Sequence, residues 1–286
     1  MAQAKELPKE DFRKMQLLQL GMIVELDRLC RKYNINYVLT CGSLLGAVRH
    51  KGYIPWDDDA DIGMLREDYE KFRKVSGELD PNVCFFQDHD NDPDYLWGYG
   101  KLRRVGTSYI RAGQEHLKGK TGVFIDIFPM DDIPIGVPGQ MFQDFYCFCL
   151  RKILWSRVGK LSEKGFMKVW FNLISHIPVD WVYNRVRPMM NRSNNSTPNK
   201  VRVLLFPSFG KLNYKHSISN RYGMPKKWFL ERSEYQFEGH LLYGSKDYDG
   251  FLKYMYDDYM TLPPEDKRDP HAPVSSYNFD VDELNG

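Results

Sequence analysis

Aspartates at alternate positions, Asp57, Asp59 and Asp61, form the most chemically informative pattern in this chain of 286 residues. Side chains two positions apart on a strand point to the same face, so the pattern predicts that these carboxylates share one side while Asp58 points away. Carboxylate oxygens are ligands that hard cations such as Mg²⁺ prefer. The pair Gly42-Ser43 lies upstream, and a small-residue turn lets backbone N–H groups approach a phosphate. We therefore expect phosphoryl-transfer chemistry, with a solvated acidic loop as the alternative.

A further acid, Asp126, lies in the apolar stretch GVFIDIFPMD at residues 122–131. Burying a carboxylate inside such a strand costs several kcal/mol unless it is paired or bound to a metal. We expect Asp126 to have a partner, which is either a metal shared with the first acids or a neighbouring Lys or Arg. A Gly-Ser turn, an Asp-x-Asp strand and a single later Asp together resemble the nucleotidyltransferase superfamily, whose members carry three metal-binding acids on a small mixed sheet.

Four ordered blocks narrow the resemblance. They are GSLLGAVRHKGYIPWDDDADIG (42–63), GYGKLRRVGTSYI (98–110), GVFIDIFPMDDIP (122–134) and YDGFLKYMYDDYMTLPPEDKR (248–268). These blocks resemble the LicD family of bacterial phosphocholine transferases, to which fukutin-type glycan phosphotransferases are more distantly related. The resemblance implies a metal-dependent phosphotransferase. Such an enzyme moves a phosphocholine-type group from a CDP-linked donor, CDP-choline in the first instance, to a sugar hydroxyl and releases CMP.

On this basis Asp59, Asp61 and Asp126 are the expected catalytic residues. These three together with Asp57 are the expected ligands of Mg²⁺, for which Mn²⁺ could substitute. Asp126 either shares a second metal or takes the proton from the acceptor hydroxyl. Metal-held positioning and charge neutralisation carry most of the rate enhancement in such reactions.

The expected donor-binding residues are a turn, three cations and one ring. Backbone N–H groups at Gly42 and Ser43 would hold a phosphate, and Arg49 lies a turn or two further on. Lys101 and Arg103 share a strand face and match the family's K-L-R block. They contact substrate or, alternatively, pair with the acidic cluster. A choline group needs aromatic faces, and Trp56 is the expected ring, with Trp97 or Tyr99 as further candidates.

Two other functions fit the same acids. One is a nucleotidyltransferase that attacks the α-phosphate of an NTP and releases pyrophosphate. The other is a non-catalytic protein that binds choline or an anionic glycan. The acceptor also stays open among teichoic acid, capsule, lipopolysaccharide and glycolipid hydroxyls.

Composition and charge point to location and partners. No stretch reaches the roughly 20 apolar residues of a membrane span, the first residues lack a signal-peptide pattern, and five cysteines without CxxC pairs suit a reducing cytoplasm. Residues 151–230 hold 16 Lys or Arg against Glu163 and Asp180, so they carry +14 and the rest of this +2 chain carries −12. This asymmetry predicts an anionic partner, a glycan acceptor or the inner face of an anionic membrane, unless it is a basic helical surface without a partner. We expect no nucleic acid.

The elements that must position these residues follow from hydrophobic periodicity. We expect helices over 10–33, 67–76 and 248–260, one from Leu44 to His50 with Ser43 as its N-cap, and helical pattern throughout 140–190. Strands are expected over 56–64, 83–87, 99–104 and 107–111, around Asp126, and as a pair within 234–242. Residues 191–200 read as an exposed loop. The fold class is α+β, a nucleotidyltransferase-like mixed sheet with flanking helices. It divides into a catalytic core (1–135), a basic, aromatic helical segment (136–228) and a C-terminal segment that packs back on the core (229–286).

Overall fold

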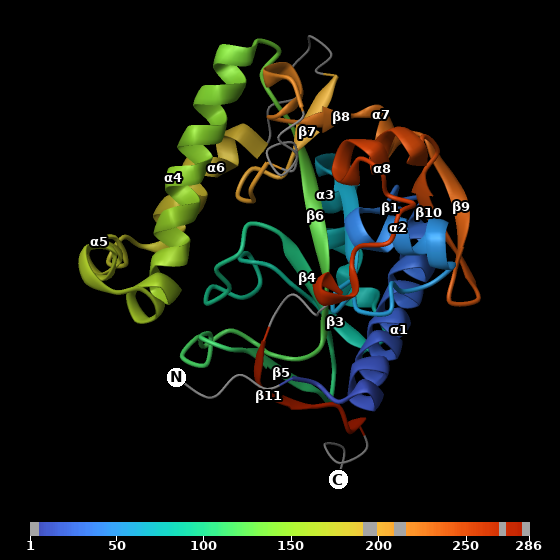
Figure 1. Cartoon of the computed structure of the whole chain (residues 1–286). Helices are drawn as coiled ribbons and strands as arrows, with labels where there is room; N and C mark the ends of the chain where they lie inside the picture. The colour runs from blue at the N-terminus through green and yellow to red at the C-terminus, as the bar shows by residue number, and fades with distance from the viewer. Residues whose placement is uncertain (1–5, 191–198, 209–215, 269–272, 282–286) are drawn as a thin grey trace.

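The computed structural model describes residues 6–190, 199–208, 216–268 and 273–281. Figure 1 shows a central sheet with helices around it and a separate group of three helices to one side. The α+β class is therefore confirmed. The loop predicted over 191–200 lies outside the described residues except for its last two positions, and Lys200 begins a strand.

A mixed sheet of nine strands, counted over the described residues, forms the centre of the molecule. Its main path runs β3-β4-β6-β2-β1-β10-β9, with β7 and β8 continuing from β6. The pairs β2–β6 and β1–β10 are parallel and the others antiparallel. The strands are β1 (Val38–Leu39), β2 (Asp61–Leu65), β3 (Cys84–Gln87), β4 (Gly100–Arg104), β6 (Phe124–Asp132), β7 (Lys200–Arg202), β8 (Met224–Pro225), β9 (Arg232–Phe237) and β10 (His240–Ser245).

Strand β6 lies inside the sheet, and every residue in it except Asp132 is buried. This explains its near-continuous apolar sequence, since a strand covered on both faces does not alternate. Helix α1 (Lys9–Tyr33) packs against β4 and β6, and α3 (Arg66–Val75) packs against β2 and β6. The helices predicted over 10–33 and 67–76 are thus confirmed, and they hold the acid-bearing strands from behind.

The three helices beside the sheet are α4 (Val137–Ser162), α5 (Gly165–Ile174) and α6 (Val179–Met190), which confirms the helical pattern expected for 140–190. Buried residues of α4 and α6 form a small hydrophobic cluster with Leu204 and Leu205, apart from the main core. Strands β7 and β8 were not predicted. They place Val201 and Met224 in the main core, so these two short strands belong to the sheet, whereas Leu204 and Leu205 pack with the helices.

The C-terminal part returns to the sheet. Strands β9 and β10 form a hairpin whose two turn residues, Glu238 and Gly239, have φ of 49° and 83°, the signature of a tight primed turn. Helices α7 (Lys227–Leu230) and α8 (Tyr248–Tyr256) pack against β10. The last strand, β11 (Val274–Asn278), pairs with β5 (Ser108–Arg111) in a second, two-stranded sheet. Three single 3₁₀ turns complete the described elements, at Ser76–Glu78, Ile218–Asn220 and Glu265–Lys267.

Candidate active site

An open cavity of about 680 Å³ lies where α2 (Cys41–His50) meets the acidic residues and the end of α8. It is called the acidic cleft below. Five aspartates line it against two cations, Arg49 and Lys267, and the aspartates are Asp57, Asp59, Asp61, Asp257 and Asp258. A cavity with this excess of carboxylates suits a ligand or ion that brings positive charge.

The acids are arranged differently from the predicted strand. Strand β2 begins only at Asp61, and residues 57–60 are irregular. Even so, Asp57, Asp59 and Asp61 line the acidic cleft and Asp58 is not among its lining residues, which agrees with the expected shared side. Oxygens of Asp57, Asp58 and Asp59 all lie within 4.8 Å of one another. These closely spaced carboxylates could serve as ligands of one hard cation.

Asp61 and Asp126 lie side by side, because β2 and β6 pair in parallel with these residues in register. Burial raises the pKa of Asp61 well above its usual range, and the neighbouring charges of Asp59, Asp126 and Asp57 add to the effect. The carboxylates therefore repel one another, and a bound divalent cation would relieve that repulsion. The donor set, oxygen only and partly buried, fits Mg²⁺ or Mn²⁺.

Asp126 also has a protein partner. Strand β4 pairs with the other edge of β6, with Lys101 in register with Asp126, and the Lys101 ammonium is bound to Oδ1 of Asp126. Of the two partners expected for Asp126, the structure therefore contains the lysine. Burial lowers the pKa of Lys101 to about 7 despite the opposing Asp126 charge. Lys101 also lies 3.3 Å from the ring centre of Phe124, a cation–π contact.

The start of α2 brings backbone donors to the cleft. The helix begins at Cys41 rather than after Ser43, so Gly42 and Ser43 lie in its first turn, where N–H groups have no partner within the helix. Ser43 does not act as the N-cap. Its hydroxyl instead accepts a hydrogen bond of 2.8 Å from the N–H of Asp61 and so ties the helix to β2. A Cβ at Gly42 would collide with Oδ2 of Asp57, which explains glycine at this position.

Arg49 and Trp56 line the same cleft. Arg49 is held at its mouth, because one guanidinium nitrogen donates a 2.7 Å hydrogen bond to the carbonyl of Tyr259. The ring of Trp56 lies 5.3 Å from the guanidinium of Arg268. It also meets the imidazole ring of His50 edge to face, with 6.3 Å between the ring centres. The last block of the chain thus contributes the far wall.

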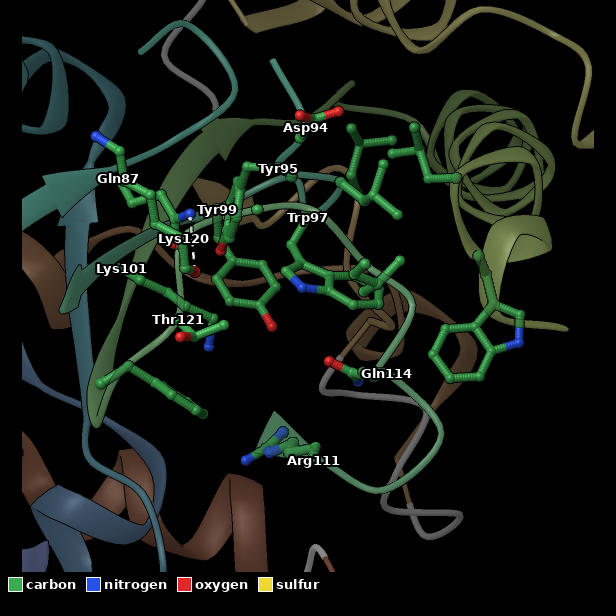
Figure 2. A pocket seen from close by; sticks show the side chains of 18 of the residues that line it. Gln87, Asp94, Tyr95, Trp97, Tyr99, Lys101, Arg111, Gln114, Lys120 and Thr121 are labelled. Atoms are coloured by element: carbon green, nitrogen blue, oxygen red, sulfur yellow. Dashed lines mark hydrogen bonds between the residues drawn. The ribbon is translucent and has the colours of Figure 1, made fainter. Parts of the chain in front are cut away.

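The remaining predicted residues line a second cavity of about 430 Å³, called the basic cavity below. Lys101, Arg103, Trp97 and Tyr99 belong to its lining, and Figure 2 shows Lys101, Trp97 and Tyr99 around a shared hollow. Arg103 is already engaged, since it donates to Gln87 (2.8 Å) and to the carbonyl of Gly122 (3.0 Å). The structure therefore separates the predicted donor-binding residues into two neighbouring sites.

Arg111 connects the two cavities and was missed in the sequence. It lines the basic cavity, and its Nη2 lies 4.0 Å from Oδ2 of Asp59 in the acidic cleft. The second sequence block ends at Ile110, one residue before Arg111. Arg111 lies two positions after Tyr109 on the same expected strand, and this spacing indicates that the two side chains share one face. Tyr256 of α8 was also missed. It lines the acidic cleft beside Asp257 and Asp258.

Comparison with known proteins gives this geometry a context. Residues 34–152 match the family model described as LicD/FKTN/FKRP, nucleotidyltransferase domain. The matched range contains α2, the acids at 57–61, and the Lys101–Asp126 pair. The chain is 28% identical over 288 aligned residues to the lipopolysaccharide cholinephosphotransferase LicD of Haemophilus influenzae. That alignment covers 95% of this chain and 99% of the relative.

Shorter matches link the chain to other proteins. It is 42% identical over 74 residues to an uncharacterised protein of Rickettsia typhi, covering 26% of this chain and 23% of that protein. The human ribitol 5-phosphate transferase FKRP is 46% identical over 43 residues, which cover 15% of this chain and 9% of FKRP.

Proposed function

We propose that this chain, whose residues 34–152 belong to the LicD/FKTN/FKRP nucleotidyltransferase family, transfers a phosphocholine-type group to a sugar hydroxyl of a cell-surface glycan. The donor is a CDP-linked compound and CMP is released. Two observations carry the proposal. The chain aligns over nearly its whole length with a lipopolysaccharide cholinephosphotransferase, and its acids gather beside a helix start in one cleft.

The donor binds in the acidic cleft. Backbone N–H groups at Gly42 and Ser43 and the positive end of α2 face its pyrophosphate, and Arg49 adds a charged donor. Asp57, Asp59 and Asp61 hold Mg²⁺ or Mn²⁺. When bound, the cation neutralises the charge on the phosphate oxygens.

Asp126 takes the proton of the acceptor hydroxyl. The hydroxyl oxygen forms a bond to the distal phosphorus, the bridging P–O bond of the pyrophosphate breaks, and CMP departs with that oxygen. Lys101 fixes the Asp126 carboxylate beside Asp61 through their ion pair. It therefore orients the base and keeps its charge next to the reacting groups.

The quaternary ammonium of a choline donor belongs on Trp56. Trp56 lies in the cleft with five aspartates, where a cation is attracted to both the ring and the carboxylates. Trp97 and Tyr99 are poorer candidates, because the basic cavity around them has more cations than acids.

Product analysis separates this proposal from its alternatives. The protein is incubated with Mg²⁺, a glycan acceptor and either CDP-choline or CTP. Release of CMP from CDP-choline supports the transferase. Pyrophosphate released from CTP would instead indicate a nucleotidyltransferase. If neither CMP nor pyrophosphate is released, by the wild type or by Asp59→Asn, the chain is a binding protein. CDP-ribitol in place of CDP-choline tests which group is transferred.

We place the protein in the cytoplasm, in contact with the inner face of an anionic membrane. All five cysteines are free, in keeping with a reducing compartment. Among the described helices none is long and apolar enough to cross a membrane. The contact would use the outer faces of α4 and α5, whose exposed apolar residues include Phe142, Phe145, Phe148, Phe166, Met167, Val169, Trp170 and Leu173.

Charge complementarity favours a lipid partner for this face. Residues 137–174 contain six Lys or Arg and only two acids, Asp144 and Glu163, and Asp144 is bound to Arg202 inside the protein. Each basic residue near an anionic leaflet contributes about 1 kcal/mol, and aromatic rings insert at the interface. A surface that combines both features is typical of peripheral attachment.

Sedimentation with vesicles tests the contact. The wild type should sediment with phosphatidylglycerol vesicles at low salt and much less with phosphatidylcholine vesicles. The double variant Phe166→Ser, Trp170→Ser should lose most of this binding. Leu241→Ser removes an exposed apolar side chain on β10 and should retain the binding. Equal binding by both variants, or no dependence on lipid charge, would contradict the membrane contact.

A further inference from the structure

The basic cavity has a built lining that the donor does not use. One wall is the sheet side, with β4, β5 and the loop around Trp97. The opposite wall is α4, which contributes Arg151, Lys152 and Trp155. Figure 2 shows Trp97, Tyr99, Gln114 and Arg111 directed toward the same hollow. At about 430 Å³ its size is that of a small-molecule site.

Positive charge dominates this lining. Two acids, Asp94 and Glu115, face six cations, which are Lys101, Arg103, Arg111, Lys120, Arg151 and Lys152. Lys101 is neutralised by Asp126, and Arg103 is held by Gln87 and a backbone carbonyl. Arg111 lies 4.0 Å from Asp59 of the acidic cleft. Lys120, Arg151 and Lys152 still outnumber the two acids, so the cavity repels a quaternary ammonium and attracts an anion.

Aromatic faces accompany the charge. The rings of Trp97 and Trp155 lie 6.0 Å apart at 43°, one from each wall, and Tyr99 packs 5.6 Å from Phe206. Flat rings beside polar and charged groups suit a ligand with both apolar faces and charged substituents. A sugar ring has such faces in its C–H groups, and a phosphate or carboxylate on it would meet the cations.

We propose that the basic cavity binds the acceptor sugar, and that this sugar carries an anionic substituent, phosphate or carboxylate. The inference rests on the proposed transfer reaction, which requires an acceptor. It adds where the acceptor binds and what chemical class it belongs to.

The position of the cavity supports this assignment. Its boundary with the acidic cleft is formed by Arg111, which is 4.0 Å from Asp59, and by the Lys101–Asp126 pair. A hydroxyl of a sugar in the basic cavity that reaches past Lys101 arrives at Asp126, the proposed proton acceptor. The donor and the acceptor thus enter from different cavities and meet at these side chains.

Calorimetry of the full chain without donor or metal tests the site directly. The titrants are glucose 6-phosphate, glucuronate, glucose and inorganic phosphate. We expect both anionic sugars to bind more tightly than glucose or phosphate alone. The double variant Arg151→Gln, Lys152→Gln should weaken binding of the anionic sugars at least fivefold. Lys160→Gln, on the same helix outside the cavity, should leave it unchanged.

Donor binding provides the internal control. CDP-choline affinity with Mg²⁺ should be the same in the wild type and the double variant, which also shows that the variant is folded. The inference is overturned if glucose binds as tightly as glucose 6-phosphate, if phosphate alone accounts for the affinity, or if the double variant binds anionic sugars normally. If anionic sugars bind as expected but no CMP is released from CDP-choline, the proposed reaction fails while the site stands.

Discussion

Replacing Asp61 by Asn should make the metal-free protein more stable although it removes activity. Asp61 is held beside Asp126 by strand register and close to Asp57 and Asp59, and its pKa is raised well above the usual range by burial and by these charges. Unfolding releases this carboxyl group to water, where it ionises more readily. At neutral pH its charge therefore favours the unfolded chain, and the neutral amide does not.

The sign and size follow from linkage. The folded protein holds the Asp61 proton more tightly than the unfolded chain does, so this carboxyl group contributes stability at low pH. That contribution is lost as the pH rises from about 4, the usual pKa of Asp, through the raised pKa of the folded state. Each tenfold change in the dissociation constant corresponds to about 1.4 kcal/mol. We expect Asp61→Asn to gain at least about 1 kcal/mol at pH 7.5, a rise in Tm of roughly 2–4 °C.

Thermal unfolding in EDTA between pH 4.5 and 8 measures this effect. The wild type should lose stability across the range more steeply than Asp61→Asn. Asp266→Asn, an exposed acid elsewhere in the chain, makes the same charge change and should follow the wild type. Adding Mg²⁺ or Mn²⁺ should stabilise the wild type, by about 2.7 kcal/mol at one hundred times the dissociation constant, and Asp61→Asn much less.

Two results would refute this reasoning. If Asp61→Asn in EDTA is less stable than the wild type at pH 7.5, the carboxylates do not repel one another as the structure indicates. If the cation stabilises the variant and the wild type equally, Asp61 is not a ligand.

Other substitutions test separate parts of the structure. Gly42→Ala places a methyl group against Asp57 and should weaken Mn²⁺ binding at least tenfold by calorimetry. The control Gly21→Ala, in open space on α1, should raise the free energy of unfolding by about 0.5–1 kcal/mol. Equal Mn²⁺ affinity in the two variants would disprove the steric argument. Arg49→Gln removes a charged hydrogen-bond donor to the phosphate, so the KM for CDP-choline should rise roughly tenfold with a smaller change in kcat. An unchanged KM in the CMP-release assay would show that Arg49 does not bind the donor. Arg66→Met leaves the fully buried carboxylate of Asp131 without its bidentate partner and should lower the free energy of unfolding by about 3–5 kcal/mol in urea; a loss below 1 kcal/mol would mean that the carboxylate is protonated at little cost.

Local pattern was sufficient for the helices and strands around the site. The apolar spacing of 10–33 predicted α1, and the apolar run around Asp126 predicted β6, because burial on one face or both leaves a direct mark on residue type. The same reasoning failed at residues 57–60. Alternation of aspartates is compatible with a strand, but the backbone there is irregular and the strand begins only at Asp61.

The sequence by itself determined which chemistry is present. Residue types and their order identified the acids, the Gly42-Ser43 pair, the cations and the α+β class, since these depend on local composition and periodicity. Only the tertiary structure decided which of these groups meet. Strand pairing across more than 60 residues put Asp61, Asp126 and Lys101 in register. The Lys101–Asp126 pair and Arg111 lie between the cavity of Trp97 and the cleft of Arg49 and Trp56. Such long-range pairings are set by the register of the whole sheet and by the burial of a shared core, which no single stretch of sequence contains.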